Sequence, residues 1–302
     1  MKLKYVYVVV VMVFVIAVET VLYGAATVQE SRVQQSARDF VAGVVAGAAE
    51  GVTGRPLDFV KNRLQQGGTW RKVLVAAARE PQRAYSGFAL NAAGNGAATA
   101  ALAVAKQWMV SAVVPAGQQP TFKEKMACAG AAGAASAVLV GPMGAMTVYK
   151  QNRGGTYGDA IRNASKTAGF KAVAAREGLW GAGLFAAYPA AKKWLLDHNQ
   201  HEVVATLGAS LTAGPAVALA SHPFDTVQAI VVGARHPKVN LDQPLPYAHV
   251  RNECDAFRYL AQNGGLCRGV WARCGRVACA LPVMMGAFEK TSVALKKLST
   301  GQ

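Results

Sequence analysis

The sequence predicts an all-α membrane protein with six transmembrane helices in three pseudo-symmetric two-helix repeats, each with a short surface helix. Three observations support this prediction. The chain of 302 residues is 52% apolar and only 16% charged. Its apolar segments carry almost no charge over about 20 residues, the length that a membrane span needs. A pattern of glycine and proline also recurs along the chain. A soluble alanine-rich bundle is the alternative interpretation.

The first 36 residues form a segment of their own, because "MKLKYVYVVVVMVFVIAV" has a basic start followed by an apolar run from Tyr5 to Val18. That pattern is typical of the core of a signal peptide. Extending the run through Glu19 to Ala26 gives an additional helix with one buried carboxylate. A start codon upstream of the true one is a third interpretation, and the sequence leaves all three open.

The recurring pattern divides the rest of the chain into three copies of about 85 residues. Each copy has a proline nine residues after a glycine, and consecutive prolines are 86 and 81 residues apart. The pairs are Gly47 with Pro56, Gly133 with Pro142, and Gly214 with Pro223. We therefore expect an extension at 1–36 and repeats at 37–115, 120–200 and 201–299.

Each copy contains an apolar segment that ends in the proline motif, then a polar stretch, then a second apolar segment. The first copy reads "DFVAGVVAGAAEGVTGRPLDFVKNRLQ", then "GGTWRKVLVAAAREPQRAYSG", then "FALNAAGNGAATAALAVAKQWMV". The polar stretch is expected to hold the short surface helix. Gly43 and Gly47 lie four residues apart, and small residues at that spacing let helices approach closely in lipid.

The motif "PLDFVKNRLQ" places a polar stripe directly after a proline that is expected to kink its helix. Asp58, Lys61 and Gln65 are three and four residues apart, so they share one helix face. Charged side chains inside a membrane bundle should face an aqueous cavity or a partner charge. The acid of one repeat is therefore expected to reach the base of its neighbour. A solvated helix end is the alternative, which the recurrence of the proline disfavours.

Composition argues against several classes of function. The net charge is +16, with 32 basic and 16 acidic residues, and the bases are scattered among the polar stretches. This distribution disfavours nucleic acid as a partner and favours anionic lipid headgroups. The five cysteines have neither disulfide nor zinc spacing. The sequence has no phosphate loop or nucleophile elbow, so no enzyme activity, cofactor or metal is expected.

These motifs resemble those of the mitochondrial carrier family. Odd-numbered helices of that family end in a pattern of proline, acid and base, followed by an acid–glycine, aromatic and base–glycine element. The resemblance covers about 260 of the 302 residues. It is closest in the first repeat, which fills every position with Pro56, Asp58, Lys61, Arg63 and Gln65.

The other two repeats depart from the family pattern. The third has its acid, Asp225, but Gln228 stands in place of the base. The second keeps its proline and the final Gln151, with Gly144 and Thr147 at the acid and base positions. The element that follows is shortened to "REPQRAYSG", "REGLWGAG" and "NGGLCRG". On the sixth helix, "FEK" resembles the start of the family's second gate motif.

Within the family, the chain is similar to the tricarboxylate (citrate) carrier branch. The matches are Glu50 in "AGAAEG", "GPM" in the second repeat, Gly94 seven residues after Gly87, and "RCGRVAC" on the sixth helix. The chain departs from that branch on the second helix, where the branch has cations and this chain has small or apolar residues near Ala98 and Leu102.

The resemblance implies that acid–base pairs between neighbouring repeats close the matrix side. One pair is intact here, Asp225 with Lys61. The pairs of Asp58 with Thr147 and of Gly144 with Gln228 each lack a charge, so the gate is predicted to be weak. With two bracing glutamines, the residues predicted for this gate are Asp58, Lys61, Gln65, Gln151, Asp225 and Gln228.

The candidate substrate site is predicted to be cationic on one side and neutral on the other. Arg273 and Arg276 share one face of the sixth helix, and the resemblance puts Arg276 at the main contact position. A buried guanidinium without an acid nearby needs an anionic ligand, although snorkelling to headgroups is the alternative. Asn91 and Asn95 could line the cavity or join helices. Lys193 could face the cavity or lie at the membrane edge.

The leading hypothesis is a multi-pass transporter of the inner mitochondrial membrane. It is expected to exchange small di- or tricarboxylate anions by alternating access around a central site, as family members do. Its expected partners are a small anionic metabolite and inner-membrane lipid such as cardiolipin, with the chain acting as a monomer. The alternative is a carrier-fold scaffold that no longer transports, because two gate pairs lack a charge.

Overall fold

A computed structural model describes residues 30–65, 69–79, 85, 88–115, 117–153, 156–235, 247 and 249–300. Residues 1–29, most of the predicted N-terminal extension, lie outside this part, and the first described helix begins at Glu30. The elements are α2 (Glu30–Gln65), α3 (Trp70–Arg79), α5 (Phe88–Val113), α6 (Phe122–Arg153), α7 (Tyr157–Asn163), α8 (Phe170–Ala182), η2 (Gly183–Ala187), α9 (Tyr188–Asp197), α10 (Glu202–Arg235), α11 (Glu253–Gln262) and α12 (Val270–Thr300).

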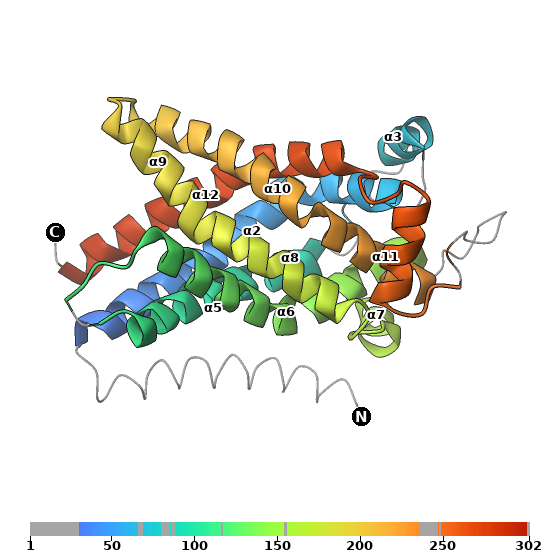
Figure 1. The fold of residues 1–302 in the computed structure, drawn as a ribbon, viewed down its shortest axis with the longest axis horizontal. Coiled ribbons are helices and arrows are strands. Elements are labelled where there is room, and N and C mark those ends of the chain that lie inside the picture. Colours follow the sequence, from blue (N-terminus) through green and yellow to red (C-terminus); the bar gives the residue numbers. More distant parts are fainter. Residues whose placement is uncertain are drawn as a thin grey trace.

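The long helices form a closed ring. Each packs against the next in chain order, from α2 through α5, α6, α8 with α9, and α10 to α12, and α12 packs back against α2. The short helices α3, α7 and α11 gather at one end of this bundle, and the C-terminal end of the chain lies at the other (Figure 1). The ring therefore has an interior and two distinct ends.

Three of the described helices are long and apolar enough to cross a membrane: Phe122–Lys150, Glu202–Arg235 and Val270–Leu298. Large apolar side chains such as Val138, Leu211 and Leu219 lie exposed on the outside, at 63%, 54% and 52%. Charged side chains, Asp225 and Arg273 among them, are buried inside. This distribution inverts the usual pattern of soluble proteins. It indicates an all-α membrane protein and disfavours the soluble bundle.

A π-helical turn, η2, joins α8 to α9. Pro189 has no backbone N–H and its ring would clash with the carbonyl of Phe185, four residues earlier. The wider turn accommodates this, and the Tyr188 N–H bonds to the carbonyl of Gly183, five residues earlier. As a result α8 and α9, of 13 and 10 residues, continue one another along one helical run.

Glycines bring neighbouring long helices into close contact. A Cβ on Gly43 or Gly47 would come within 2.6 or 2.5 Å of the α5 backbone. One on Gly133 would lie 2.1 Å from a carbonyl oxygen of α8, and one on Gly214 would lie 2.9 Å from a side chain of α12. Real Cβ contacts are longer, so a larger residue at Gly43, Gly47 or Gly133 would push the helices apart, and one at Gly214 would require a side chain of α12 to shift. The close approach predicted from Gly43 and Gly47 is confirmed.

The three recurring prolines, Pro56, Pro142 and Pro223, lie inside α2, α6 and α10, as expected from the motif. Two further glycines, Gly169 and Gly269, have φ angles of 73° and 80° and directly precede α8 and α12. Glycine adopts this left-handed conformation without strain. Each of them therefore turns the chain into the start of a long helix.

The short helix α7 begins with a capping box. The Thr156 side chain accepts a hydrogen bond from the Asp159 N–H, and the Asp159 carboxylate accepts from the Thr156 N–H and hydroxyl at 2.8 Å each. These bonds favour the ionised carboxylate and hold the pKa of Asp159 below its ordinary value. At the start of α11, the Asn252 side chain likewise accepts from the Asp255 N–H at 2.9 Å.

Candidate functional site

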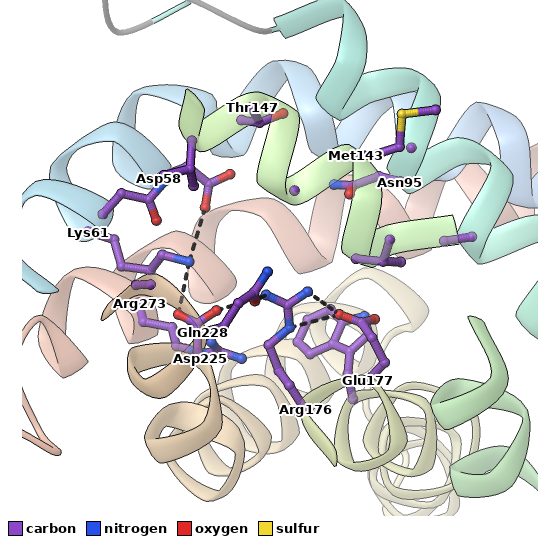
Figure 2. Close-up of a pocket in the computed structure, with 18 of the residues that line it drawn as sticks. Asp58, Lys61, Asn95, Met143, Thr147, Arg176, Glu177, Asp225, Gln228 and Arg273 are labelled. Carbon is purple, nitrogen blue, oxygen red and sulfur yellow. Dashed lines mark hydrogen bonds and ion pairs between the residues drawn. The ribbon is translucent and has the colours of Figure 1, made fainter. Parts of the chain in front are cut away.

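A cavity of about 130 Å³ lies inside the ring, lined by residues of α2, α5, α6, α8, α10 and α12. It has two unlike walls. The helices α2, α8, α10 and α12 contribute all the charged side chains among the lining residues, whereas α5 and α6 contribute neutral ones. Figure 2 shows this contrast, with Arg176, Glu177 and Asp225 on one side of the space and Asn95 and Thr147 on the other.

Asp225 is the centre of the charged wall. Its carboxylate lies 2.7 Å from Arg273 Nη1, 3.0 Å from Lys61 Nζ and 3.0 Å from Arg176 Nη1. Gln65 donates a further hydrogen bond at 2.8 Å. The Asp225 side chain is only 3% exposed, so these partners replace the water that a carboxylate would otherwise need. Residues from four helices thus meet at one acid.

Arg276 lies between two further acids. Its Nη2 donates to Glu50 Oε1 at 2.5 Å, and its Nε lies 2.7 Å from Asp58 Oδ1. Asn95 also donates to Glu50, at 3.2 Å, across the gap between α5 and α2. The sequence-based premise that no acid lies near this arginine is therefore wrong, because α2 brings two carboxylates to the start of α12.

Arg176 is a site residue that the motif analysis missed. Its guanidinium contacts Glu177 at 2.5 Å, Asp225 at 3.0 Å and the Gln228 side-chain oxygen at 2.6 Å. The shortened element "REGLWGAG", which the sequence analysis places after the proline motif of the second repeat, lies within α8 and η2. The available signal was spacing: Arg176 lies seven residues after Gly169, as Arg276 lies seven after Gly269.

Five of the six residues predicted for the matrix gate line the cavity on this wall: Asp58, Lys61, Gln65, Asp225 and Gln228. The Lys61–Asp225 contact is present, and Lys61 also lies 3.8 Å from Asp58. A Cβ on Gly144 would lie 3.3 Å from the Gln228 side-chain nitrogen, so those two positions adjoin as expected. However, arginines make up for the missing bases, since Arg176 bonds to Gln228 and Arg276 pairs with Asp58. The network therefore contains more ion pairs than the motifs predicted.

Three further residues predicted for the gate or the substrate site are Gln65, Gln151 and Asn91. Gln65 is fully buried and donates to Asp225 and Thr226, which fits a bracing role. Gln151 lies near the end of α6 and Asn91 near the start of α5. Their side chains are outside the described part of the chain, so their predicted roles stay predictions.

Lys193 does not join the central cavity. It is exposed and pairs with Asp197 at 2.8 Å, near the far end of α9. At 1.5 Å per residue, the 17 residues from Arg176 to Lys193 extend about 25 Å along the helix. Lys193 lines a second cavity of about 540 Å³, beside the pair of Lys192 and Glu289, which are 2.6 Å apart. The expected grouping of Lys193 with Arg276 is therefore wrong.

The charged wall carries equal numbers of acids and bases, where the sequence predicted a cationic side. The charged residues that line the cavity are Glu50, Asp58, Glu177 and Asp225 with Lys61, Arg176, Arg273 and Arg276. Arg273 is buried and donates to the Ser221 hydroxyl at 2.7 Å, so it does not snorkel to headgroups. Across the cavity, the Thr147 hydroxyl is buried and has no hydrogen-bond partner within the described residues.

Compared with known proteins, the chain matches no family model, and no curated protein matches it. The resemblance to mitochondrial carriers therefore rests on the motifs quoted above and stays a prediction. The geometry described here, a polar cavity inside a ring of helices, stands independently of that resemblance.

Proposed function

We propose that the chain is a transporter of the inner mitochondrial membrane that exchanges small carboxylates by alternating access around the central cavity. One observation carries this proposal: an apolar outer surface encloses a cavity whose wall holds eight charged side chains from four helices. Ionisable groups are rare inside membranes and mark the paths of substrates or ions. Purely structural contacts between helices would not need so many.

A threefold, six-span organisation is part of the proposal. Its support is the element order, in which a long helix, a short helix and a long helical run follow one another three times. Further support comes from Gly47, Gly133 and Gly214, each of which lies against the next long helix of its own copy. A structural repeat of this kind is typical of transporters whose site lies between the repeats.

Alternating access requires that each end of the cavity can be closed. Lys61 and Asp225 lie in the parts of α2 and α10 that lead to the short helices α3 and α11, whereas Lys192 and Glu289 lie towards the opposite ends of the ring, in α9 and the C-terminal part of α12. Lys192 also lies 3.6 Å from Glu202, and Tyr188 donates to Glu289 at 3.3 Å. In the proposed cycle, the two networks open in turn, so that the cavity faces one side of the membrane at a time.

Carboxylates are proposed as substrates because Arg176 and Arg276 present guanidinium groups at the cavity. A guanidinium is a planar fork that matches a carboxylate. We further propose that the protein is a monomer in the inner mitochondrial membrane, is surrounded by anionic lipid and has no enzyme activity. The scattered basic residues and the net charge of +16 favour that lipid environment.

The test is uptake of radiolabelled malate, citrate, glutamine, phosphate and ADP into cardiolipin-containing liposomes that hold the purified protein and the same unlabelled compound. We expect uptake of a carboxylate, reduced at least tenfold in the Arg176→Gln variant. The matched control is Arg162→Gln, an exposed arginine of α7 away from the cavity. Equal loss in both variants would contradict the assignment of the cavity as the transport site.

The alternative is a non-transporting scaffold, and the absence of a charge in two predicted gate pairs favours it. Exchanging the charges of Lys61 and Asp225 is a poor discriminator, because the new lysine would adjoin Arg273 and Arg176. Exchanging the charges of the Lys192–Glu289 pair is the clearer test. A transporter should lose uptake in Lys192→Glu and regain part of it when Glu289→Lys is added. A folded protein that takes up nothing in any form would favour the scaffold.

A further inference from the structure

The charges around the central cavity are not evenly mixed. Glu50 and Asp58 flank Arg276, so this group has two acids for one base. The remaining charged lining residues have three bases for two acids: Lys61, Arg176 and Arg273 with Glu177 and Asp225. We call the first group the acidic pole and the second the basic pole. The two groups adjoin where Lys61 lies 3.8 Å from Asp58. The lining is therefore neutral as a whole, with one more acid than base in the first group and one more base than acid in the second.

Overall neutrality limits the charge of a ligand that can bind here. A molecule with only carboxylates would give the occupied cavity a net negative charge, in surroundings where uncompensated charge is costly. A molecule with one carboxylate and one ammonium group leaves the total at zero. The ammonium group of such a ligand can pair with an acid and its carboxylate with a base, so that no buried charged group is left without a counter-charge.

The poles can each accept one end of a zwitterion. At the acidic pole, the Glu50 carboxylate lines the cavity and accepts hydrogen bonds from the Asn95 amide at 3.2 Å and from Arg276 at 2.5 Å, so it can accept from an ammonium group as well. At the basic pole, the Arg176 guanidinium borders the cavity opposite Thr147 (Figure 2). The Thr147 hydroxyl is 4% exposed by residue and has no partner within the described residues, so it can donate to a carboxylate.

We propose that the substrate of this cavity is a small zwitterion with the head group of an amino acid. Its ammonium group lies at the acidic pole by Glu50 and Asp58, and its carboxylate lies at the basic pole between Arg176 and Thr147. This inference rests on the proposed transport function and specifies the class of carboxylate that is carried. The cavity volume of about 130 Å³ suits a small molecule.

The test compares amino acids with related carboxylates that lack the positive charge. Glycine, serine, glutamine and ornithine, each beside its α-N-acetyl derivative, and malate are offered to proteoliposomes in homo-exchange. We expect exchange of at least one amino acid and at least tenfold slower exchange of its acetylated form. In Glu50→Gln, the amino acid concentration for half-maximal uptake should rise at least tenfold. The matched control is Glu253→Gln on the short helix α11, which should leave it unchanged.

A second readout separates this inference from the transport proposal. Thermal unfolding of the detergent-purified protein is measured with each compound, because ligands that bind the folded state raise its melting temperature. Stabilisation by an amino acid without any exchange would overturn transport but support the zwitterion site. Exchange of malate with no exchange or stabilisation by any amino acid would overturn the zwitterion site and leave transport standing. No effect of any compound in either assay would overturn both.

Discussion

Asp225 shows how much one buried side chain determines in this protein. Three cations from α2, α8 and α12 and the Gln65 amide converge on its carboxylate. Ion pairs buried in this way add little net stability when intact, because desolvation offsets their attraction. Removing the shared partner is different, since it leaves several buried cations uncompensated.

We therefore expect Asp225→Asn to be strongly destabilising. Loss of one partner of a buried ion pair costs about 3–5 kcal/mol. The control is Asp197→Asn, whose exposed pair with Lys193 should contribute about 0–1 kcal/mol. Thermal unfolding in detergent checks this prediction. Equal shifts for the two variants would mean that the described network does not hold the helices together.

At the scale of elements, the contact between α6 and α8 depends on Gly133. A Cβ there would lie 2.1 Å from the Glu177 carbonyl oxygen, so the two helices would have to separate. That separation would also move Arg176 and Glu177, which lie on α8 at the charged wall. Packing and site geometry are thus linked through one glycine.

The Gly133→Ala substitution should lower stability by about 1–3 kcal/mol, as overpacking does. Gly286→Ala on α12 is the matched control, because a Cβ there has no neighbour within 4 Å. Alanine stabilises a helix by about 1 kcal/mol relative to glycine, so the Gly286→Ala substitution should leave protein stability unchanged or raise it slightly. Melting temperatures of both variants in detergent give the comparison, and a stabilised Gly133→Ala would contradict the close approach.

The short helix α3 has the character of a membrane-surface helix. Val73 packs against Phe59 and Leu64 of α2, whereas Trp70 and Leu74 are about half exposed, at 47% and 53%. The helix has basic residues and no acid, unlike α11 with its Glu253 and Asp255. Helices of this composition lie in the interface with their apolar side in the lipid.

We expect the amides of α3 to exchange with deuterium more slowly in nanodiscs that contain anionic lipid than in zwitterionic ones. Each basic residue near an anionic surface contributes about 1 kcal/mol, so Arg71→Gln with Lys72→Gln should remove most of the difference. The amides of α11 serve as the internal control and should not respond to the lipid. Identical exchange of α3 in both nanodiscs would contradict recognition of anionic headgroups.

At the scale of the whole molecule, the number of membrane spans determines on which side each loop lies. Three described helices meet the criteria of length and apolar composition, and six spans are proposed. An arrangement with six spans and one with three differ in whether the connections near Gly117 and Asn199 lie on the same side of the membrane. With six spans both lie on one side, whereas with only α6, α10 and α12 spanning they lie on opposite sides.

Single cysteines at these two positions, in a cysteine-free background, therefore distinguish the arrangements. The five native cysteines must be replaced first, because Cys254, Cys267 and Cys279 are exposed. We expect a membrane-impermeant thiol reagent to label both positions from the same side of oriented proteoliposomes. A cysteine at Asn263, between α11 and α12, should be labelled only from the other side. Labelling of the first two positions from opposite sides would contradict six spans.

The local features of this protein were readable from its sequence. Apolar run lengths and the low share of charged residues predicted helices in a membrane, because a span must satisfy its backbone internally whatever surrounds it. The recurring glycines and prolines predicted helix contacts and the positions of prolines inside long helices. The spacing of Asp58, Lys61 and Gln65 predicted a shared polar face. All these properties depend on residues close together in the chain.

Apart from the Lys61–Asp225 pair, which charges meet was decided only by the tertiary structure. The sequence places Glu50 and Arg276 more than 200 residues apart, and only the closure of α12 onto α2 makes them a pair. The start of α8, set by Gly169, brought Arg176 to the cavity and left Lys193 about 25 Å away along the helix. A motif gives the charge of each residue, but the net charge of a cavity is a sum over helices that meet only in the folded ring. For this reason a wall predicted to be cationic proved to be balanced.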